Sequence, residues 1–102
     1  MLVERLTFQV KYGEGDKFVA LMREMTAIMP PELSKGRLYT DATGTMFTVQ
    51  LETEFADWPA YAAAMVAERE SYADPRFQQL FSRMQALTER GERQVLNFEV
   101  MV

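Results

Sequence analysis

The sequence predicts one α+β domain over residues 1–102, in which a four-stranded antiparallel sheet carries helices on one face. The length fits one domain, and 48% apolar with 25% charged residues is typical of a chain with an ordinary hydrophobic core. Apolar residues recur at every second position in four segments, and at spacings of three and four in three others. Along the chain these segments give the order β-α-β-β-α-α-β.

The first strand is predicted over residues 3–12, where apolar and polar side chains alternate. Residues 13–16, with two glycines, end this strand, and an amphipathic helix follows. The helix is indicated by apolar residues at helical spacing: Phe18, Leu21, Met22, Met25, Ile28 and Met29. A proline pair at residues 30–31 stops it, because proline lacks the backbone donor that a helix interior needs.

Two further alternating segments, residues 35–41 and 45–53, predict a hairpin. Residues 42–44 form its loop, with Gly44 available for a positive φ.

Two helices come next, and each is introduced by an aspartate. Asp57 is a good N-cap for a helix over residues 58–72, and Pro59 sits in the first turn, where proline is tolerated. Asp74, followed by proline, gives the same signal for a helix over residues 75–89.

The last element is a strand over residues 92–102, with Gly91 ending the helix before it. One face of this strand is predicted to carry Leu96, Phe98, Val100 and Val102. The opposite face is predicted to carry Val95, Asn97, Glu99 and Met101.

Right-handed crossovers convert this order into a ferredoxin-like arrangement whose second helix is split in two. The sheet face toward the helices is predicted to carry Phe8, Val10, Phe47, Val49, Leu51, Phe98 and Val100. The other face is predicted to carry Thr7, Gln9, Tyr39, Met46, Thr48, Gln50, Asn97 and Met101. That mixture is richer in Met and Tyr than a fully solvated face, and the last strand is a long apolar edge. We therefore expect a homodimer in which two sheets pack face to face.

Composition excludes several kinds of function. Without Cys or His the chain has no disulfide, thiolate site, thiol nucleophile or imidazole base, so we expect no metal and no cofactor. The net charge of −4 and the scattered Arg and Lys argue against nucleic-acid binding. The charged N-terminus is unlike a signal peptide, and the longest apolar run, near residues 60–67, is too short to span a membrane. We expect a cytoplasmic protein that does not act at a membrane.

The element order and length resemble the dimeric α/β-barrel superfamily, which includes antibiotic-biosynthesis monooxygenase domains and NIPSNAP domains. Two local motifs share in the resemblance: Asp57-Trp58-Pro59-x-Tyr61 and Asp74-Pro75-x-Phe77-x-x-Leu80. The resemblance covers nearly the whole chain and implies a homodimer whose sheets form a barrel, with a small-molecule cleft between sheet and helices. Superfamily members include cofactor-free oxygenases, haem-degrading enzymes and lactone isomerases. The haem-handling branches rely on an axial His, which this sequence lacks.

The candidate ligand-binding residues are Trp58, Tyr61, Tyr39 and Asn97. Trp58 and Tyr61 would form an apolar wall for a flat aromatic molecule, and Tyr39 or Asn97 would donate a hydrogen bond to it. In cofactor-free oxygenation the substrate's own phenolate supplies the electrons, so the protein provides orientation and desolvation. The competing interpretation is that Trp58 and Tyr61 are core anchors.

Two other groups of residues have both a functional and a structural interpretation. Five methionines on apolar helical faces can line an adaptable cavity or simply fill the core: Met22, Met25, Met29, Met65 and Met84. Glu52, Glu54 and Asp57 can act as acid–base groups or Mg²⁺ ligands, or can form a solvated rim in which Asp57 caps a helix.

Two functional hypotheses therefore stand. The first is a small-ligand protein, with a cofactor-independent monooxygenase-like activity on an aromatic or apolar molecule. The second is a non-catalytic dimeric NIPSNAP-like structural or interaction module. No pattern in the sequence decides whether the chain is an enzyme or names a catalytic residue.

Overall fold

The elements of the structure follow the predicted order. The structure is a computed structural model that describes residues 1–101. Its strands are β1 (Leu2–Val10), β2 (Gly36–Thr40), β3 (Thr48–Phe55) and β4 (Thr88–Asn97). Its helices are α1 (Gly15–Ile28), α2 (Trp58–Ser71) and α3 (Pro75–Leu87), with a short 3-10 turn, η1 (Pro31–Leu33), after α1.

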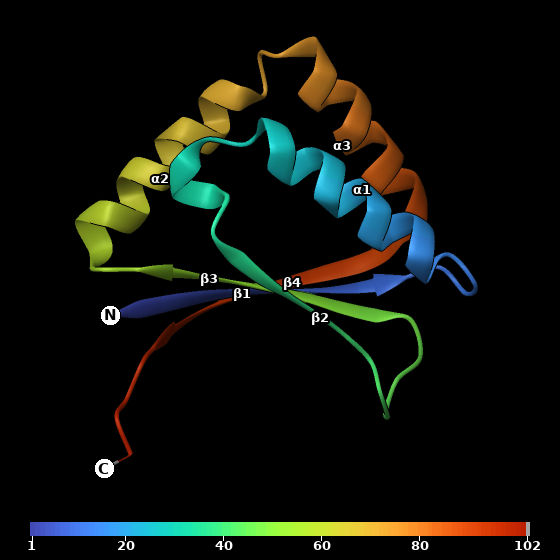
Figure 1. The fold of residues 1–102 in the computed structure, drawn as a ribbon, viewed down its shortest axis with the longest axis horizontal. Helices are drawn as coiled ribbons and strands as arrows, with labels where there is room; N and C mark the ends of the chain where they lie inside the picture. Colours follow the sequence, from blue (N-terminus) through green and yellow to red (C-terminus); the bar gives the residue numbers. More distant parts are fainter. Residues whose placement is uncertain (102) are drawn as a thin grey trace.

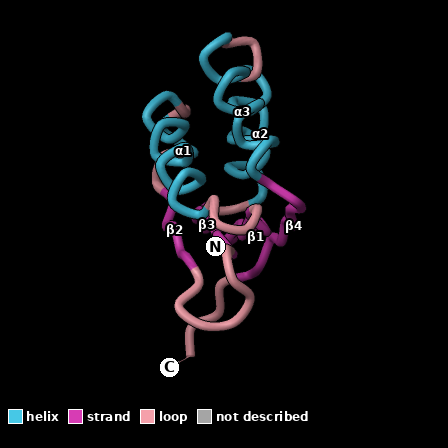
Figure 2. The backbone as a smooth tube through the Cα atoms, turned by 90° about the vertical axis from the view of Figure 1, so that its right-hand side faces the viewer, coloured by secondary structure: helices cyan, strands magenta, loops and turns pink. Residues whose placement is uncertain are grey.

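The four strands form one antiparallel sheet in the order β2-β3-β1-β4. All three helices lie on the same side of it, and the other side is uncovered (Figures 1 and 2). This confirms the predicted α+β fold with a four-stranded antiparallel sheet and helices on one face. Each helix in the described part of the chain falls short, in length or apolar character, of what crossing a lipid bilayer requires.

The helix starts have the predicted physical causes. The Asp57 carboxylate accepts a hydrogen bond from the backbone N–H of Ala60 at 2.9 Å. The Asp74 carboxylate accepts one from the backbone N–H of Arg76, also at 2.9 Å. These bonds satisfy donors that a helix N-terminus leaves without an intrahelical partner. Both helices also carry proline in the first turn, as predicted.

The core between sheet and helices consists of two separate clusters. The larger lies beneath α1 and α3 and contains seven buried residues: Val10, Phe18, Leu21, Met22, Met25, Val49 and Phe77. The smaller lies beneath α2 and contains Leu2, Phe55 and Ala64. Leu2 and Val10 are the two ends of β1, so the clusters occupy opposite ends of the sheet.

The last strand differs from its prediction in both bounds. α3 ends at Leu87, and β4 begins at the very next residue, so Gly91 lies inside the strand instead of ending the helix. Gly91 pairs with Phe8, whose ring would be 3.5 Å from a Cβ at this position. The strand ends at Asn97, which pairs with Leu2, the first residue of β1.

The predicted faces of β4 are also wrong, as the pairing of β4 with β1 shows. Val95 pairs with Glu4 and packs on the smaller core cluster, so it faces the helices, whereas Leu96 pairs with Val3 on the uncovered side. Phe98 and Val100 follow the strand and are 50% and 70% exposed, so neither belongs to the core face. Val102, the last residue of the predicted strand, lies outside the described residues.

The hairpin loop is longer than predicted. It covers residues 41–47, and β3 begins at Thr48 instead of Thr45. Gly44 has a φ of 93°, as its predicted role requires, but Phe47 also adopts a positive φ, of 58°. Phe47 therefore lies in the turn, where its ring packs edge-on against Tyr12 at 4.8 Å.

Candidate functional site

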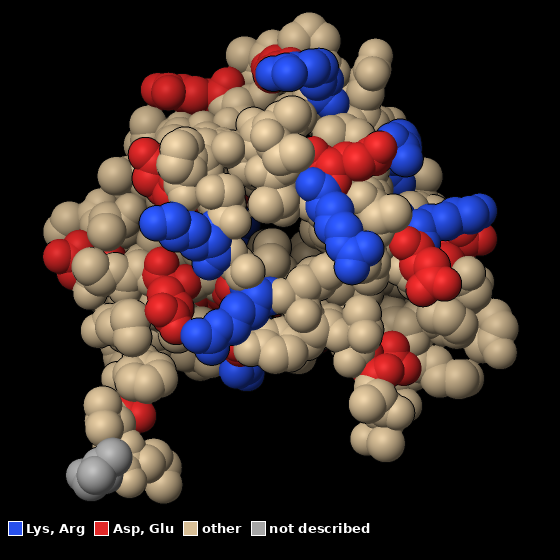
Figure 3. All heavy atoms as spheres, viewed as in Figure 1, with Lys and Arg blue, Asp and Glu red and all other residues tan. Residues whose placement is uncertain are grey.

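A cleft of about 320 Å³ lies between the sheet and the helices. It separates the two core clusters, and the middle positions of the sheet, Leu6 and Leu51, line it and stay only half-buried. A second cavity, of about 430 Å³ under α1 and η1, shares Leu51 and Leu33 with it. The face of the molecule drawn in Figure 3 is hollowed between helices and sheet. The volume is within the usual range for small-molecule sites.

The local sequence explains why this space is not filled. β4 places Gly91 opposite Phe8 and Arg93 opposite Leu6, so its contribution to the middle of the helix-facing side is one residue without a side chain and one cation. The chain also turns between α2 and α3, over residues 72–74, so each helix covers a different end of the sheet (Figure 1). The apolar cover is therefore interrupted above the middle of β1.

Most of the cleft wall is apolar and polarisable. α1 contributes Met22 and Met25, Met29 directly follows it, and α3 contributes Phe77, Phe81 and Met84. The ring of Tyr72 lies 5.2 Å from that of Phe77 and 5.8 Å from that of Phe81, between centroids. Aromatic faces together with flexible thioethers suit a flat apolar molecule without dictating one shape.

Five polar side chains also line the cleft: those of Thr26, Glu68, Tyr72, Glu92 and Arg93. Arg93 forms an ion pair with Glu4, with 3.5 Å between Nε and Oε2. The Tyr72 hydroxyl donates a hydrogen bond to Glu68 at a long 3.5 Å. These groups place both a cation and a carboxylate beside an otherwise apolar space.

A buried polar group lies behind them. Glu4, with only 7% of its side chain exposed, accepts a hydrogen bond from the Tyr61 hydroxyl at 2.8 Å. Burial raises the pKa of the Tyr61 phenol, and its hydrogen bond to Glu4 raises it further. The pKa of the Glu68 carboxyl is raised chiefly by burial and then by the nearby Glu4 carboxylate. The pKa of the Tyr72 phenol is raised by burial and then by Glu68.

The four residues expected from sequence are not gathered around this cleft. Trp58 and Tyr61 lie together, with ring centroids 5.8 Å apart, but Trp58 is 59% exposed and is not a core residue of the single chain. Tyr39 is on the uncovered side of the sheet, in register with Gln50. Asn97 is exposed at the end of β4. Their part in ligand binding stays a prediction.

The methionines satisfy both interpretations offered for them. Met22 and Met25 belong to the larger core cluster, and both also line the cleft together with Met29 and Met84. The fifth, Met65, packs against the smaller cluster instead.

The acidic residues where β3 leaves the sheet have structural partners. Glu52 accepts a hydrogen bond from Arg5 at 2.7 Å, which lowers the pKa of the Glu52 carboxyl. Glu54 lies 3.8 Å from Arg37, and Asp57 caps α2. The predicted helix cap at Asp57 is confirmed, and each of these carboxylates is accounted for without a metal or a catalytic role.

Sequence analysis missed Glu68 and Arg93, and one signal was available for Glu68. Tyr61, Ala64, Glu68 and Tyr72 recur at spacings of three and four, so Glu68 falls on the inward stripe of α2. A glutamate on a buried stripe is unusual and merits a functional question. Arg93 gave no such signal, because the predicted faces of its strand were wrong.

Comparison with known proteins places the fold. No protein-family model matches the sequence, and no curated protein is similar enough to count as a match. Solved structures do match: a NIPSNAP family protein from Agrobacterium tumefaciens has a TM-score of 0.82 and 21% identity, covering 99% of this chain and 88% of its own. An uncharacterised NIPSNAP domain protein from Burkholderia xenovorans has a TM-score of 0.75 and 22% identity, covering 100% and 98%.

The second group of structural neighbours consists of monooxygenase-like proteins. SnoaB, a cofactor-independent oxygenase from Streptomyces nogalater, has a TM-score of 0.67 and 16% identity, covering 99% of this chain and 95% of its own. At such identities the likeness shows a shared fold and nothing of activity. The chain therefore has the ferredoxin-like fold of NIPSNAP and antibiotic-biosynthesis-monooxygenase proteins.

Proposed function

We propose that this chain binds a small, flat, largely apolar molecule in the cleft between its sheet and its helices. The observation that carries the proposal is an open space of about 320 Å³ where a domain of this size would ordinarily be packed. Methionines and aromatic rings line it, and Glu68, Tyr72 and Arg93 supply directional contacts. Apolar walls with a few placed polar groups are typical of sites for small organic molecules.

The proposed reaction is cofactor-independent oxygenation of the bound molecule, and the shared fold of SnoaB supports it. A substrate that becomes an electron-rich anion can reduce O₂ itself, so the protein supplies orientation, desolvation and charge stabilisation. For a CH₂ group conjugated with that anion, O₂ takes four electrons from the carbon. One oxygen atom stays as the carbonyl, and the other leaves with the two hydrogens as water. The competing proposal is a module that binds without turnover.

Filling the cleft mouth tests the binding proposal. Thr26 lines the cleft but is exposed on α1, so Thr26→Trp adds bulk there without removing core. We expect it to weaken the binding of 2-methoxynaphthalene, measured by calorimetry, by at least about ten-fold, which is roughly 1.4 kcal/mol. The neighbouring Ala27→Trp, exposed on the same helix, is the matched control and should bind as the unmodified chain does.

Two results would contradict this proposal: no binding to the unmodified chain, or unchanged binding by Thr26→Trp. Trp58→Ala tests whether the site predicted from the sequence takes part in ligand binding, since Trp58 does not line the cleft. If it weakens binding while Thr26→Trp does not, the ligand lies near the start of α2 instead. Uptake of O₂ with the bound aromatic then distinguishes an oxygenase from a module without turnover.

We also propose that two copies of the chain pack through the uncovered side of the sheet. This side carries charges of both signs, and Arg5 with Glu52 and Arg37 with Glu54 already form pairs across its strands. A surface so balanced can meet a second copy of itself without net repulsion. An unpaired sheet face with half-buried Val3 and Leu96 also has apolar area to bury.

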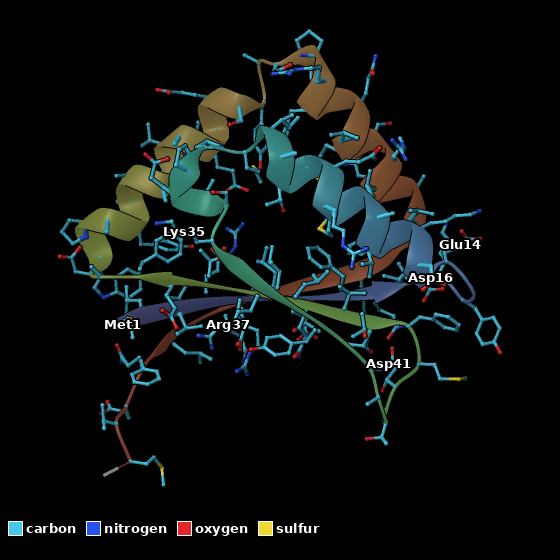
Figure 4. The ribbon with its side chains drawn as sticks, in the orientation of Figure 1. Met1, Glu14, Asp16, Lys35, Arg37 and Asp41 are labelled. Carbon is cyan, nitrogen blue, oxygen red and sulfur yellow. The ribbon has the colours of Figure 1, made fainter. Side chains whose placement is uncertain are left out.

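Two projections frame that surface. The loop over residues 41–47 and the segment that follows β4 both extend from the sheet away from the helices (Figure 1). Asp41 marks the start of the loop in Figure 4. The loop carries Met46, 58% exposed, and the segment after β4 carries Phe98, Val100 and Met101, all at least 50% exposed. Apolar side chains on both projections would be covered by a partner seated between them.

Native mass spectrometry tests this assembly, with an expected mass of twice the 11.8 kDa chain. Thr7→Lys places a cation in the middle of the uncovered side, beside Gln50, and should shift the population to monomer. Ser82→Lys, exposed on α3, should leave the dimer intact. A monomer in the unmodified chain would overturn the dimer proposal.

A further inference from the structure

The Glu68 carboxylate in the cleft has few hydrogen-bond partners for a half-buried charged group. Its carboxylate lines an otherwise largely apolar space, is half-buried, and has one long hydrogen bond, the 3.5 Å contact from the Tyr72 hydroxyl. A carboxylate withdrawn from water needs hydrogen-bond donors to stabilise its charge. Burial and the Glu4 carboxylate accordingly raise the pKa of the Glu68 carboxyl. A bound molecule that offers a donor would complete this site.

The charged and titratable groups around Glu68 come from β1, β4 and α2 with its C-cap. β1 supplies Glu4, β4 supplies Glu92 and Arg93, α2 supplies Tyr61, and Tyr72 directly follows α2. The residues that line the cleft from α1, from the position after it and from α3 are uncharged: Met22, Met25, Thr26, Met29, Phe77, Phe81 and Met84.

Glu4, Glu68 and Glu92 are the carboxylates at the cleft. Glu92 lines it from an exposed position of β4, whereas Glu68 lines it as a half-buried carboxylate. Glu4 lies below the lining, where the Tyr61 hydroxyl and Arg93 already occupy its Oε2 atom at 2.8 Å and 3.5 Å. Arg93 lines the cleft as well, so a negative charge formed on a ligand would lie in a space that already holds a cation. A proton acceptor that lines a largely apolar cavity can deprotonate a ligand, and a cation lining the same cavity stabilises the anion.

We propose that Glu68 accepts a proton from the bound molecule, which is therefore an aromatic compound carrying an acidic hydroxyl group, such as a phenol conjugated with a carbonyl. The inference rests on the proposed binding function of the cleft. The ligand O–H bond breaks and a Glu68 O–H bond forms, so the negative charge moves from the carboxylate to the ligand oxygen. The total charge of the cleft is unchanged, and Arg93 stabilises the anion that forms.

Fluorescence of 2-naphthol tests this step, because its excited state is a far stronger acid than its ground state and its neutral and anionic forms emit at different wavelengths. A carboxylate beside the naphthol hydroxyl can accept this proton, and the difference between the unmodified chain and Glu68→Gln reports the transfer to Glu68. We expect 2-naphthol bound to the unmodified chain to emit from the anion, and bound Glu68→Gln to lose that band while retaining affinity for 2-methoxynaphthalene, which has no acidic proton. Glu68→Asp should recover part of the band, and Glu70→Gln, exposed on the same helix, should keep all of it.

The pH dependence provides a second readout. The anion band should disappear as the pH falls through the pKa of Glu68, because the protonated carboxyl cannot accept a proton.

Glu68→Gln is expected to fold. The pKa of Glu68 is higher in the folded chain than in the unfolded chain, so between these two pKa values the folded state binds more protons than the unfolded state does. Stability from this group therefore falls as the pH rises through that window, and removing the charge at neutral pH costs no stability by this route.

The outcomes separate the two claims. Equal anion emission from the unmodified chain and Glu68→Gln, with both naphthalenes bound, overturns the role of Glu68 and leaves the binding function standing. Absence of binding by either naphthalene overturns the binding function, and the role of Glu68 with it.

Discussion

Replacing Phe18 with alanine is expected to lower the free energy of unfolding by about 3–5 kcal/mol. Phe18 is fully buried on α1, and its ring lies 5.2 Å from that of Phe8 in the sheet. The substitution removes apolar contacts on the sheet side of the helix and leaves a hole that the surrounding side chains close only in part. Because small domains are stable by about 5–15 kcal/mol, this one change removes a large share of the total.

Urea denaturation followed by circular dichroism measures the effect. Phe18→Leu should cost less than Phe18→Ala, since it keeps most of the buried volume. Val66→Ala, on a side chain that is 54% exposed, should change the stability by less than about 0.5 kcal/mol. A loss below about 1 kcal/mol for Phe18→Ala would mean that α1 does not pack on the sheet as described.

The second large effect is expected for Tyr61→Phe, which should destabilise the fold by about 1–3 kcal/mol. The change removes only the hydroxyl that donates to Glu4 at 2.8 Å, and it leaves the packing of the ring against Phe55 in place. Glu4 then stays buried with one donor fewer, because Arg93 at 3.5 Å is a longer partner. The cost is therefore the penalty of an under-satisfied buried carboxylate.

A double-mutant cycle isolates that bond from other effects of the substitutions. In the Glu4→Gln background, where the acceptor is neutral, Tyr61→Phe should cost clearly less than in the unmodified chain. Tyr12→Phe removes a hydroxyl from a residue that is 77% exposed and should be neutral. Equal costs of Tyr61→Phe in both backgrounds would show that Glu4 and Tyr61 do not interact in solution.

Most of the fold could be predicted because its signals are local. Alternation, helical spacing and the aspartates at residues 57 and 74 each reflect forces that act within a few residues. The failure at β4 has the opposite origin. The alternating pattern continues through Phe98 and Val100, but the paired part of β4 ends at Asn97, opposite Leu2 in β1. One more backbone bond joins the Phe98 N–H to the Met1 carbonyl at 3.0 Å. Local pattern carries no information about where a distant partner ends.

The role of Gly91 also could not be predicted from the local sequence pattern. A glycine after a helical pattern ordinarily marks the end of the helix, and the sequence predicts this role for Gly91. Here the helix ends earlier, at Leu87, and Gly91 is the strand position on which the Phe8 ring packs. The contact joins residues more than 80 positions apart, and so the reason for this glycine is visible only in three dimensions.

The candidate site was harder to predict than the fold because it is a space between elements. The cleft exists since α2 and α3 cover different ends of the sheet, and the sequence sets helix lengths without setting helix directions. Trp58 is predicted to form an apolar wall for a ligand, yet it is largely exposed at the start of α2 and does not line the cleft. Glu68 could have been found from its place on the inward stripe, whereas Arg93 needed the true register.

The junction between α3 and β4 connects two walls of the cleft directly. Thr88 caps the helix and is also the first residue of the strand, and its hydroxyl donates to the Met84 carbonyl at 2.7 Å. The helix therefore passes directly into the strand, with no loop between them. The two elements supply different walls of the cleft, Phe77 and Phe81 from α3 and Arg93 from β4. The aromatic wall of the cleft and its cation are thus joined by a short, continuous stretch of regular backbone.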